Sequence, residues 1–103
     1  MKTCMTCGMP FVGAHANDIG LDTPDGSVCI YDTKEGQIKT AKEIFEGGVQ
    51  FFMTEATDGN RELAEKITRK NMHALPYWQN HPFAELSGPE ATDQEFGETM
   101  AKL

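Results

Sequence analysis

The first cysteines of the chain have a spacing that suits a metal ion. Cys4 and Cys7 form a Cys-x-x-Cys pair followed directly by Gly8, and Cys29 lies further along in "SVCIYD". Asp32 stands three residues after Cys29, where a cysteine would complete a second pair. Zinc prefers four ligands at the corners of a tetrahedron and accepts both thiolate sulfur and carboxylate oxygen. The spacing therefore indicates one structural Zn²⁺ site.

Each half of this site is expected to be a tight turn. In the first turn, backbone N–H groups point toward the thiolates of Cys4 and Cys7 and stabilise their negative charge. Gly8 suits the left-handed conformation that ends such a turn, because it has no Cβ. A second turn carrying Cys29 and Asp32 would face the first and close the tetrahedron.

The fourth ligand is the open question in this pattern. Asp32 is favoured by its spacing, and the alternatives are His15, Asp22, Asp25 or a water molecule. His15 is the best alternative because imidazole is a common zinc ligand. If Asp32 does bind, a hard oxygen replaces a soft sulfur, so we expect weaker zinc binding that is more sensitive to acid and chelators.

Short strands between turns are expected to position these ligands. Residues 1–39 are rich in glycine, and "TPDG" at 23–26 is a strong turn signal, since proline presets one backbone dihedral and glycine accepts a positive one. We predict a hairpin in which 27–31 pairs with 36–40 across "DTKEG".

The pattern changes to helical spacing after Thr40. Thr40 and Glu43 form a capping box, in which each side chain takes a free backbone N–H, so a helix is predicted over 41 to about 53. Gly47 and Gly48 weaken this helix by about 1 kcal/mol each relative to alanine, and predict a kink or an early stop. Alternatively, the two glycines let another backbone approach closely.

Further helices are expected in the remaining sequence. Thr57 or Asp58 is predicted to cap a second helix that runs to about Ala74, and the aromatic segment 76–83 is expected to fold back over the helices. A short acidic helix is predicted within 84–103, beginning near Pro89 or Thr92.

The fold class predicted from these elements is α+β. A zinc ribbon at 1–40 precedes a helical unit at 41–83 and an acidic tail at 84–103, all in one compact domain of 103 residues. The first segment carries few apolar residues, and a small unit of this kind usually needs a metal or a disulfide to hold it together. Three cysteines, an odd number, favour the metal.

The motifs resemble a known family. "CMTCGMP" at 4–10, "DGS" at 25–27, "CIYD" at 29–32 and the capped helix after them resemble the zinc ribbon domain family of small bacterial and archaeal proteins. The resemblance covers roughly residues 3–78 and implies a fold and a zinc ion but no activity. The matching positions are Cys4, Cys7, Gly8, Met9, Pro10, Cys29, Tyr31 and Gly36. Asp32 stands where that family carries its fourth cysteine.

Charge and composition exclude several classes of function. The net charge is −7, and residues 79–103 carry one basic and five acidic side chains. Because nucleic-acid binding needs a basic patch, we expect none. Without an apolar run of about 20 residues or a signal peptide, we expect no membrane span and a cytoplasmic location. No catalytic arrangement of side chains is present, so we expect no enzymatic activity.

The function favoured by the sequence is a structural zinc module that acts through an unidentified protein partner. Candidate contact residues are Phe51, Phe83, Tyr77 and Trp78, although core packing is the commoner role of such aromatics. The alternative is a thiol redox or metal-responsive protein that uses Cys4, Cys7 and a weakly held zinc. The oligomeric state is left open.

Overall fold

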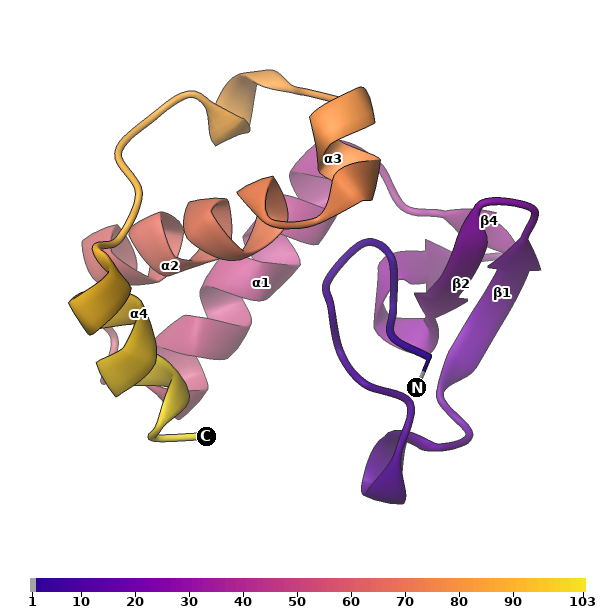
Figure 1. The fold of residues 1–103 in the computed structure, drawn as a ribbon, viewed down its shortest axis with the longest axis horizontal. Helices are drawn as coiled ribbons and strands as arrows, with labels where there is room; N and C mark the ends of the chain where they lie inside the picture. Colours follow the sequence, from indigo (N-terminus) through magenta and orange to yellow (C-terminus); the bar gives the residue numbers. More distant parts are fainter. Residues whose placement is uncertain (1) are drawn as a thin grey trace.

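The computed structural model of the protein describes residues 2–103. Two small antiparallel hairpins come first in the chain, and helices make up the remainder (Figure 1). The predicted α+β class, a zinc ribbon followed by a helical unit, is confirmed. Within the described range, no helix combines the length and the apolar character needed to cross a membrane.

The first hairpin joins β1 (Ile19–Thr23) to β2 (Gly26–Cys29) through a two-residue turn. Its turn is the predicted "TPDG" segment, in which the Thr23 hydroxyl accepts the backbone N–H groups of Asp25 and Gly26. The Thr23 hydroxyl also donates to the Gly26 carbonyl at 2.9 Å. The turn signal at this position is therefore confirmed.

The predicted pairing of 27–31 with 36–40 is wrong. β2 ends at Cys29 and pairs backward with β1, and the second hairpin joins β3 (Thr33–Lys34) to β4 (Gln37–Ile38). Between the hairpins, Ile30–Asp32 forms a single 3-10 turn. The physical reason is that a two-residue turn closes a hairpin at a lower entropic cost than a longer loop. The 3-10 turn then directs Asp32 inward, where it is buried.

The first helix, α1 (Ala41–Glu55), begins at the predicted capping box. The Thr40 hydroxyl accepts the Glu43 N–H, and the Glu43 carboxylate accepts the Thr40 N–H. The helix continues through Gly47 and Gly48, so the predicted early stop at these residues is wrong. A Cβ placed on Gly48 would lie 3.1 Å from Cγ2 of Thr68, so this glycine lets α1 pack closely on the next helix.

The second helix, α2 (Arg61–His73), begins later than predicted. Its N-cap is Asn60, whose side chain accepts the N–H of Leu63, so the predicted cap at Thr57 or Asp58 is wrong. Thr57 instead donates its hydroxyl to the Asn60 carbonyl, and Asp58 adopts a positive φ of 50°. These residues form the turn that reverses the chain between α1 and α2.

The last part of the chain, after α2, runs back along this helix (Figure 1). It contains α3 (Pro76–Asn80), the 3-10 turn Ala84–Leu86 and α4 (Asp93–Met100). Thr92 forms a capping box with Glu95, which confirms the predicted acidic helix. Lys70 Nζ of α2 lies 2.8 Å from Asp93 Oδ1 of α4, and because the Asp93 side chain is almost fully exposed, this ion pair links the two helices but adds little stability.

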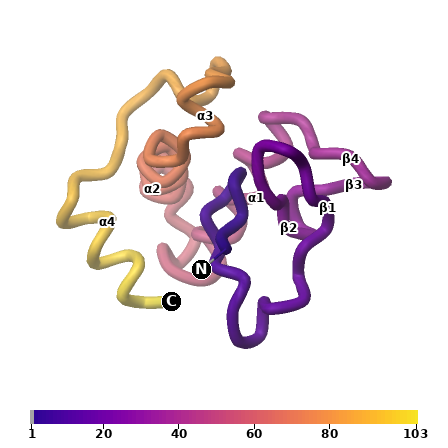
Figure 2. Tube along the Cα trace, turned by 45° about the vertical axis from the view of Figure 1, so that its right-hand side comes forward, coloured from indigo at the N-terminus to yellow at the C-terminus, as the bar shows by residue number. Residues whose placement is uncertain are grey.

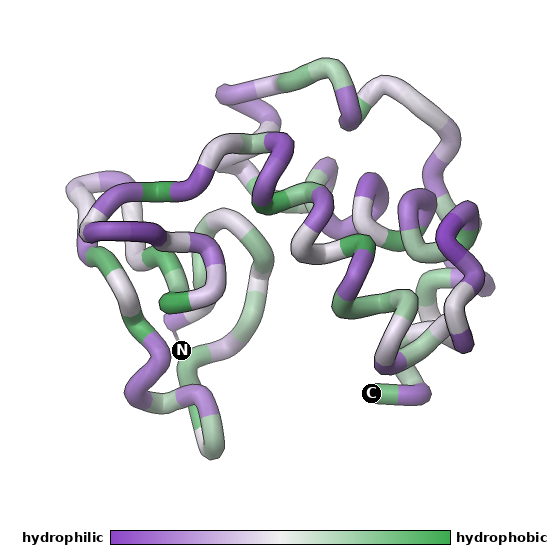
Figure 3. The backbone as a smooth tube through the Cα atoms, turned by 180° about the vertical axis from the view of Figure 1, so that it is seen from behind, coloured by the Kyte–Doolittle hydropathy of each residue, from purple (hydrophilic) through white to green (hydrophobic). Residues whose placement is uncertain are grey.

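The protein has two apolar clusters. The larger one lies among the helices, along which hydrophobic and hydrophilic segments alternate (Figure 3). The smaller one lies in the ribbon and contains Cys4, Phe11, Val28 and Cys29. The partly buried Ile38 packs against both clusters. The N-terminal stretch lies between the hairpins and the helices in both views of the backbone (Figures 1 and 2). Cys4 accepts a hydrogen bond from Cys29 of β2, and Cys7 accepts one from Asn71 of α2, so these two cysteines lie at the junction of the two halves.

Candidate metal centre

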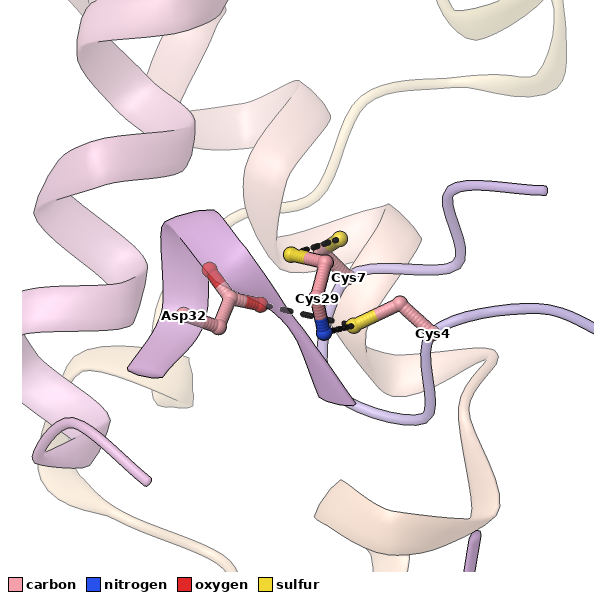
Figure 4. A group of neighbouring side chains, drawn as sticks. All are labelled: Cys4, Cys7, Cys29 and Asp32. Carbon is pink, nitrogen blue, oxygen red and sulfur yellow. Dashed lines mark hydrogen bonds between the residues drawn. The ribbon is translucent and has the colours of Figure 1, made fainter. Parts of the chain in front are cut away.

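Four side chains converge at the junction of the two halves. The ligand atoms of Cys4, Cys7, Cys29 and Asp32 all lie within 4.8 Å of one another (Figure 4). They come from the N-terminal turn, from the end of β2 and from the 3-10 turn that follows it. The structure therefore brings together all four residues that the spacing singled out.

Two of the distances between the ligand atoms match those of a tetrahedral zinc site. With Zn–S bonds of about 2.3 Å, two sulfurs at neighbouring corners lie about 3.8 Å apart, and a sulfur and an oxygen lie about 3.6 Å apart. Cys7 Sγ and Cys29 Sγ are 3.8 Å apart, and Cys4 Sγ and Asp32 Oδ2 are 3.7 Å apart. These two pairs share no atom, so they correspond to opposite edges of one tetrahedron.

The cluster is closed to solvent on most sides. Cys4 and Cys29 have no exposed surface, Asp32 is 8% exposed, and Cys7 is half-buried. Structural zinc sites are typically closed, whereas catalytic sites keep one position open for water or substrate. The burial therefore suits a structural ion better than a catalytic one.

The first turn has the geometry expected of a Cys-x-x-Cys-Gly unit. The N–H of Gly8 donates to the Cys4 carbonyl at 2.8 Å, and Gly8 adopts a φ of 80°, in the left-handed region. The N–H of Cys29 donates to Cys4 Sγ at 3.3 Å. The stabilising N–H group thus comes from the facing strand, across the site.

Comparison with known proteins identifies the family. A family model described as "Putative zinc ribbon domain" matches residues 3–79. The chain belongs to this family. Neither the curated proteins nor the solved structures that were searched gave a match. The resemblance inferred from the motifs is confirmed, and the matched range ends within α3, before the acidic tail.

In this zinc ribbon, the position of Asp32 fits the replacement of a cysteine by aspartate. Its carboxylate points from the 3-10 turn toward Cys4 and Cys29 (Figure 4). An aspartate side chain is one bond longer than that of cysteine and offers an oxygen that binds zinc at about 2.0–2.2 Å, slightly closer than sulfur. The residues present therefore fit a zinc ion, with three thiolates and one carboxylate as its candidate ligands.

A buried threonine contacts this carboxylate, and sequence reasoning missed it. The Thr6 hydroxyl donates to Asp32 Oδ2 at 2.6 Å and lies 3.1 Å from Cys4 Sγ. Thr6 has no exposed surface. It occupies one of the two variable positions of the Cys-x-x-Cys pair, and the spacing gave no signal that would have identified it.

The helical half holds the first turn from the other side. The indole N–H of Trp78 donates to the Thr6 carbonyl at 2.9 Å, and the side-chain amide of Asn71 donates to the Cys7 carbonyl at 2.9 Å. Trp78 comes from α3 and Asn71 from α2, so two helices anchor the turn between the cysteines. Sequence reasoning assigned neither residue to the site.

The four acidic groups influence one another's ionisation. Burial raises the pKa of Asp32. The pKa of Cys7 is also raised, mainly by hydrogen bonding with Cys29. The pKa of Cys4 is held far below its usual range, first by hydrogen bonding from Cys29 and then from Cys7. Zinc would favour the ionised form of every ligand, so we expect its binding to release protons.

The alternative fourth ligands lie outside the cluster. His15 lies in the 3-10 turn Gly13–His15 and has its Nδ1 2.8 Å from the carboxylate of Asp18. Asp22 accepts a hydrogen bond from the Ser27 hydroxyl, and Asp25 is exposed in the hairpin turn. Among the residues that the structure describes, the cysteines are grouped with Asp32.

Proposed function

We propose that this protein is a structural zinc module that binds one Zn²⁺ and acts through contacts with a protein partner. Cys4, Cys7, Cys29 and Asp32 would hold the ion. The observation that carries the proposal is the convergence of these four ligand atoms within 4.8 Å, in a protein of the zinc ribbon family.

A structural role for zinc follows from the weakness of the ribbon without it. The two hairpins are separate two-stranded sheets, and isolated two-stranded hairpins are marginal in water. Among residues 2–103, four buried hydrophobic residues form the ribbon cluster, and two of them are Cys4 and Cys29. One ion would join the N-terminal turn to β2 and to the 3-10 turn, and so stabilise the segments on which the ribbon depends.

The proposed protein contacts are supported by apolar side chains at the surface. Phe51 on α1 is 50% exposed, and Val12, Ile30 and Tyr31 of the ribbon are exposed as well. Of the other aromatics suggested by the sequence, Trp78 is buried in the helical cluster, and Tyr77 and Phe83 pack partly against it. Phe51 is therefore the candidate contact residue that remains from that group.

The zinc content of the purified protein tests the proposal. Native mass spectrometry of protein prepared without chelator should show one zinc per chain in the parent, and its loss or marked weakening in Asp32→Ala. Asp25→Ala is the matched control, because Asp25 is an acidic residue exposed in the hairpin turn and should leave zinc binding unchanged. A folded parent without zinc would contradict the proposal, and full retention in Asp32→Ala would remove Asp32 from the ligand set.

The redox alternative also has an observation in its favour. Cys7 is half-buried, and its sulfur lies 3.8 Å from that of Cys29, which makes this pair a candidate for disulfide formation in addition to Cys4 and Cys7. Hydrogen peroxide would oxidise two thiolates to a disulfide, take up two protons and be reduced to two water molecules, and the zinc held by these thiolates would be released. Zinc release and disulfide mapping after peroxide treatment distinguish the two functions, since a purely structural module should keep its zinc.

A further inference from the structure

The hydroxyl of Thr6 is aimed at the carboxylate that would bind zinc. Thr6 lies between Cys4 and Cys7, has no exposed surface and donates to Asp32 Oδ2 at 2.6 Å. An O–H···O⁻ hydrogen bond of this length falls in the range of charge-assisted bonds, which are about twice as strong as neutral ones. The hydroxyl and its acceptor are 26 residues apart in the sequence, so only the fold brings them together.

This hydrogen bond and the contact with Cys4 involve the same oxygen of the carboxylate. An aspartate has two equivalent oxygens and a broad range of rotation about its terminal bond. Oδ2, the oxygen that accepts the Thr6 hydroxyl, is also the oxygen 3.7 Å from Cys4 Sγ (Figure 4). A hydrogen bond to one lone pair of Oδ2 leaves another lone pair free for a metal ion.

Thr6 is itself fixed by the helical half. Its backbone carbonyl accepts the indole N–H of Trp78, and the neighbouring Cys7 carbonyl accepts the amide of Asn71. The donor is therefore placed by α2 and α3, while its acceptor is placed by the 3-10 turn of the ribbon. The contact depends on both halves of the protein being docked.

We propose that Thr6 is a positioning residue for the metal, whose hydroxyl holds Asp32 Oδ2 toward the three sulfurs and so makes the carboxylate an effective fourth ligand. The inference rests on the proposed zinc site. Partners that orient a metal ligand typically contribute 10- to 100-fold to metal affinity, and this is the size of effect expected here.

The test is a double-mutant cycle on the full chain. Zinc affinity is measured by competition with a chromophoric chelator in the parent, Thr6→Val, Asp32→Cys and the double variant. Thr6→Val should weaken zinc binding about 10- to 100-fold in the parent. When Thr6→Val is added to Asp32→Cys, it should change the zinc affinity less than about threefold, because sulfur is a weak hydrogen-bond acceptor. Thr6→Ser restores the hydroxyl and should bind within about threefold of the parent, since the charge-assisted bond is kept.

Several results would overturn the role of Thr6. An unchanged zinc affinity in Thr6→Val would do so. An equal loss of zinc affinity from Thr6→Val in the parent and in Asp32→Cys would also do so, because it would indicate a packing effect. If Thr6→Val fails to fold with zinc both in the parent and in Asp32→Cys, the result counts against the positioning role. If it fails to fold only where Asp32 is present, the result supports that role. If the parent binds zinc and one of these contrary results is obtained, the positioning role of Thr6 is refuted and the proposed function is not. If the parent binds no zinc, the proposed function itself is refuted.

Discussion

Replacing Trp78 with phenylalanine removes a hydrogen bond that joins the helical half to the turn between Cys4 and Cys7. The indole N–H donates to the Thr6 carbonyl at 2.9 Å, and the residue is 3% exposed. Phenylalanine keeps an aromatic ring that can continue to pack against Tyr77 and Phe83, whose ring centroids lie 4.8 and 5.0 Å from that of Trp78. The change therefore acts mainly on the hydrogen bond.

The expected loss can be estimated from two contributions. A buried carbonyl left without its donor costs about 1–3 kcal/mol. The smaller ring leaves unfilled space, which costs about 1 kcal/mol more for a partial truncation of this kind. We therefore expect Trp78→Phe to lower the free energy of unfolding by about 2–4 kcal/mol, a large part of the about 5–15 kcal/mol that a typical domain possesses.

Urea unfolding at a fixed excess of zinc measures this difference. Far-UV circular dichroism is the suitable signal, because the substitution removes the single tryptophan of the chain. Tyr77→Phe is the matched control, since it keeps the neighbouring ring and leaves the bond to Thr6 in place. A loss below about 0.5 kcal/mol in Trp78→Phe, the size of an ordinary surface effect, would refute the reasoning that this bond anchors the turn.

Two further predictions concern α1 and the metal ligand. Gly47→Ala should raise the free energy of unfolding by about 0.5–1 kcal/mol, because an added Cβ would be in open space, whereas Gly48→Ala should gain less because its Cβ would lie 3.1 Å from Thr68 Cγ2. Equal gains in urea unfolding would contradict this account of the helix packing. Burial raises the pKa of Asp32 in the folded protein above its value in the unfolded chain. The contribution of Asp32 to stability is therefore fully present below its pKa in the unfolded chain and is lost as the pH rises through its pKa in the folded protein. Asp32→Asn should therefore raise the melting temperature of zinc-free protein near neutral pH but not at about pH 3, and an equal effect at both would argue against this cause.

Local signals were sufficient for the parts of the fold that depend on neighbouring residues. The capping box of Thr40 and Glu43 and the turn at 23–26 both formed as predicted, because each is closed by hydrogen bonds within four residues. The strand pairing was predicted wrongly, because 27–29 can pair with the segment before it or the segment after it, and the short turn at 23–26 favours β1. The cap of α2 was predicted wrongly because several residues at 57–60 can accept an N–H. Asn60 caps the helix, and the Thr57 hydroxyl donates to the Asn60 carbonyl within the preceding turn.

The sequence by itself determined which residue types could bind a metal and how they are spaced, since Cys4, Cys7 and Cys29 can be chosen from the pattern alone and the spacing favours Asp32 over His15 as the fourth ligand. Only the tertiary structure decided what surrounds them. Thr6 meets Asp32 across 26 residues, Asn71 meets Cys7 across 64, and Trp78 meets Thr6 across 72. Such contacts leave no periodicity in the sequence, because a hydrogen-bond donor can serve any acceptor that docking brings within reach.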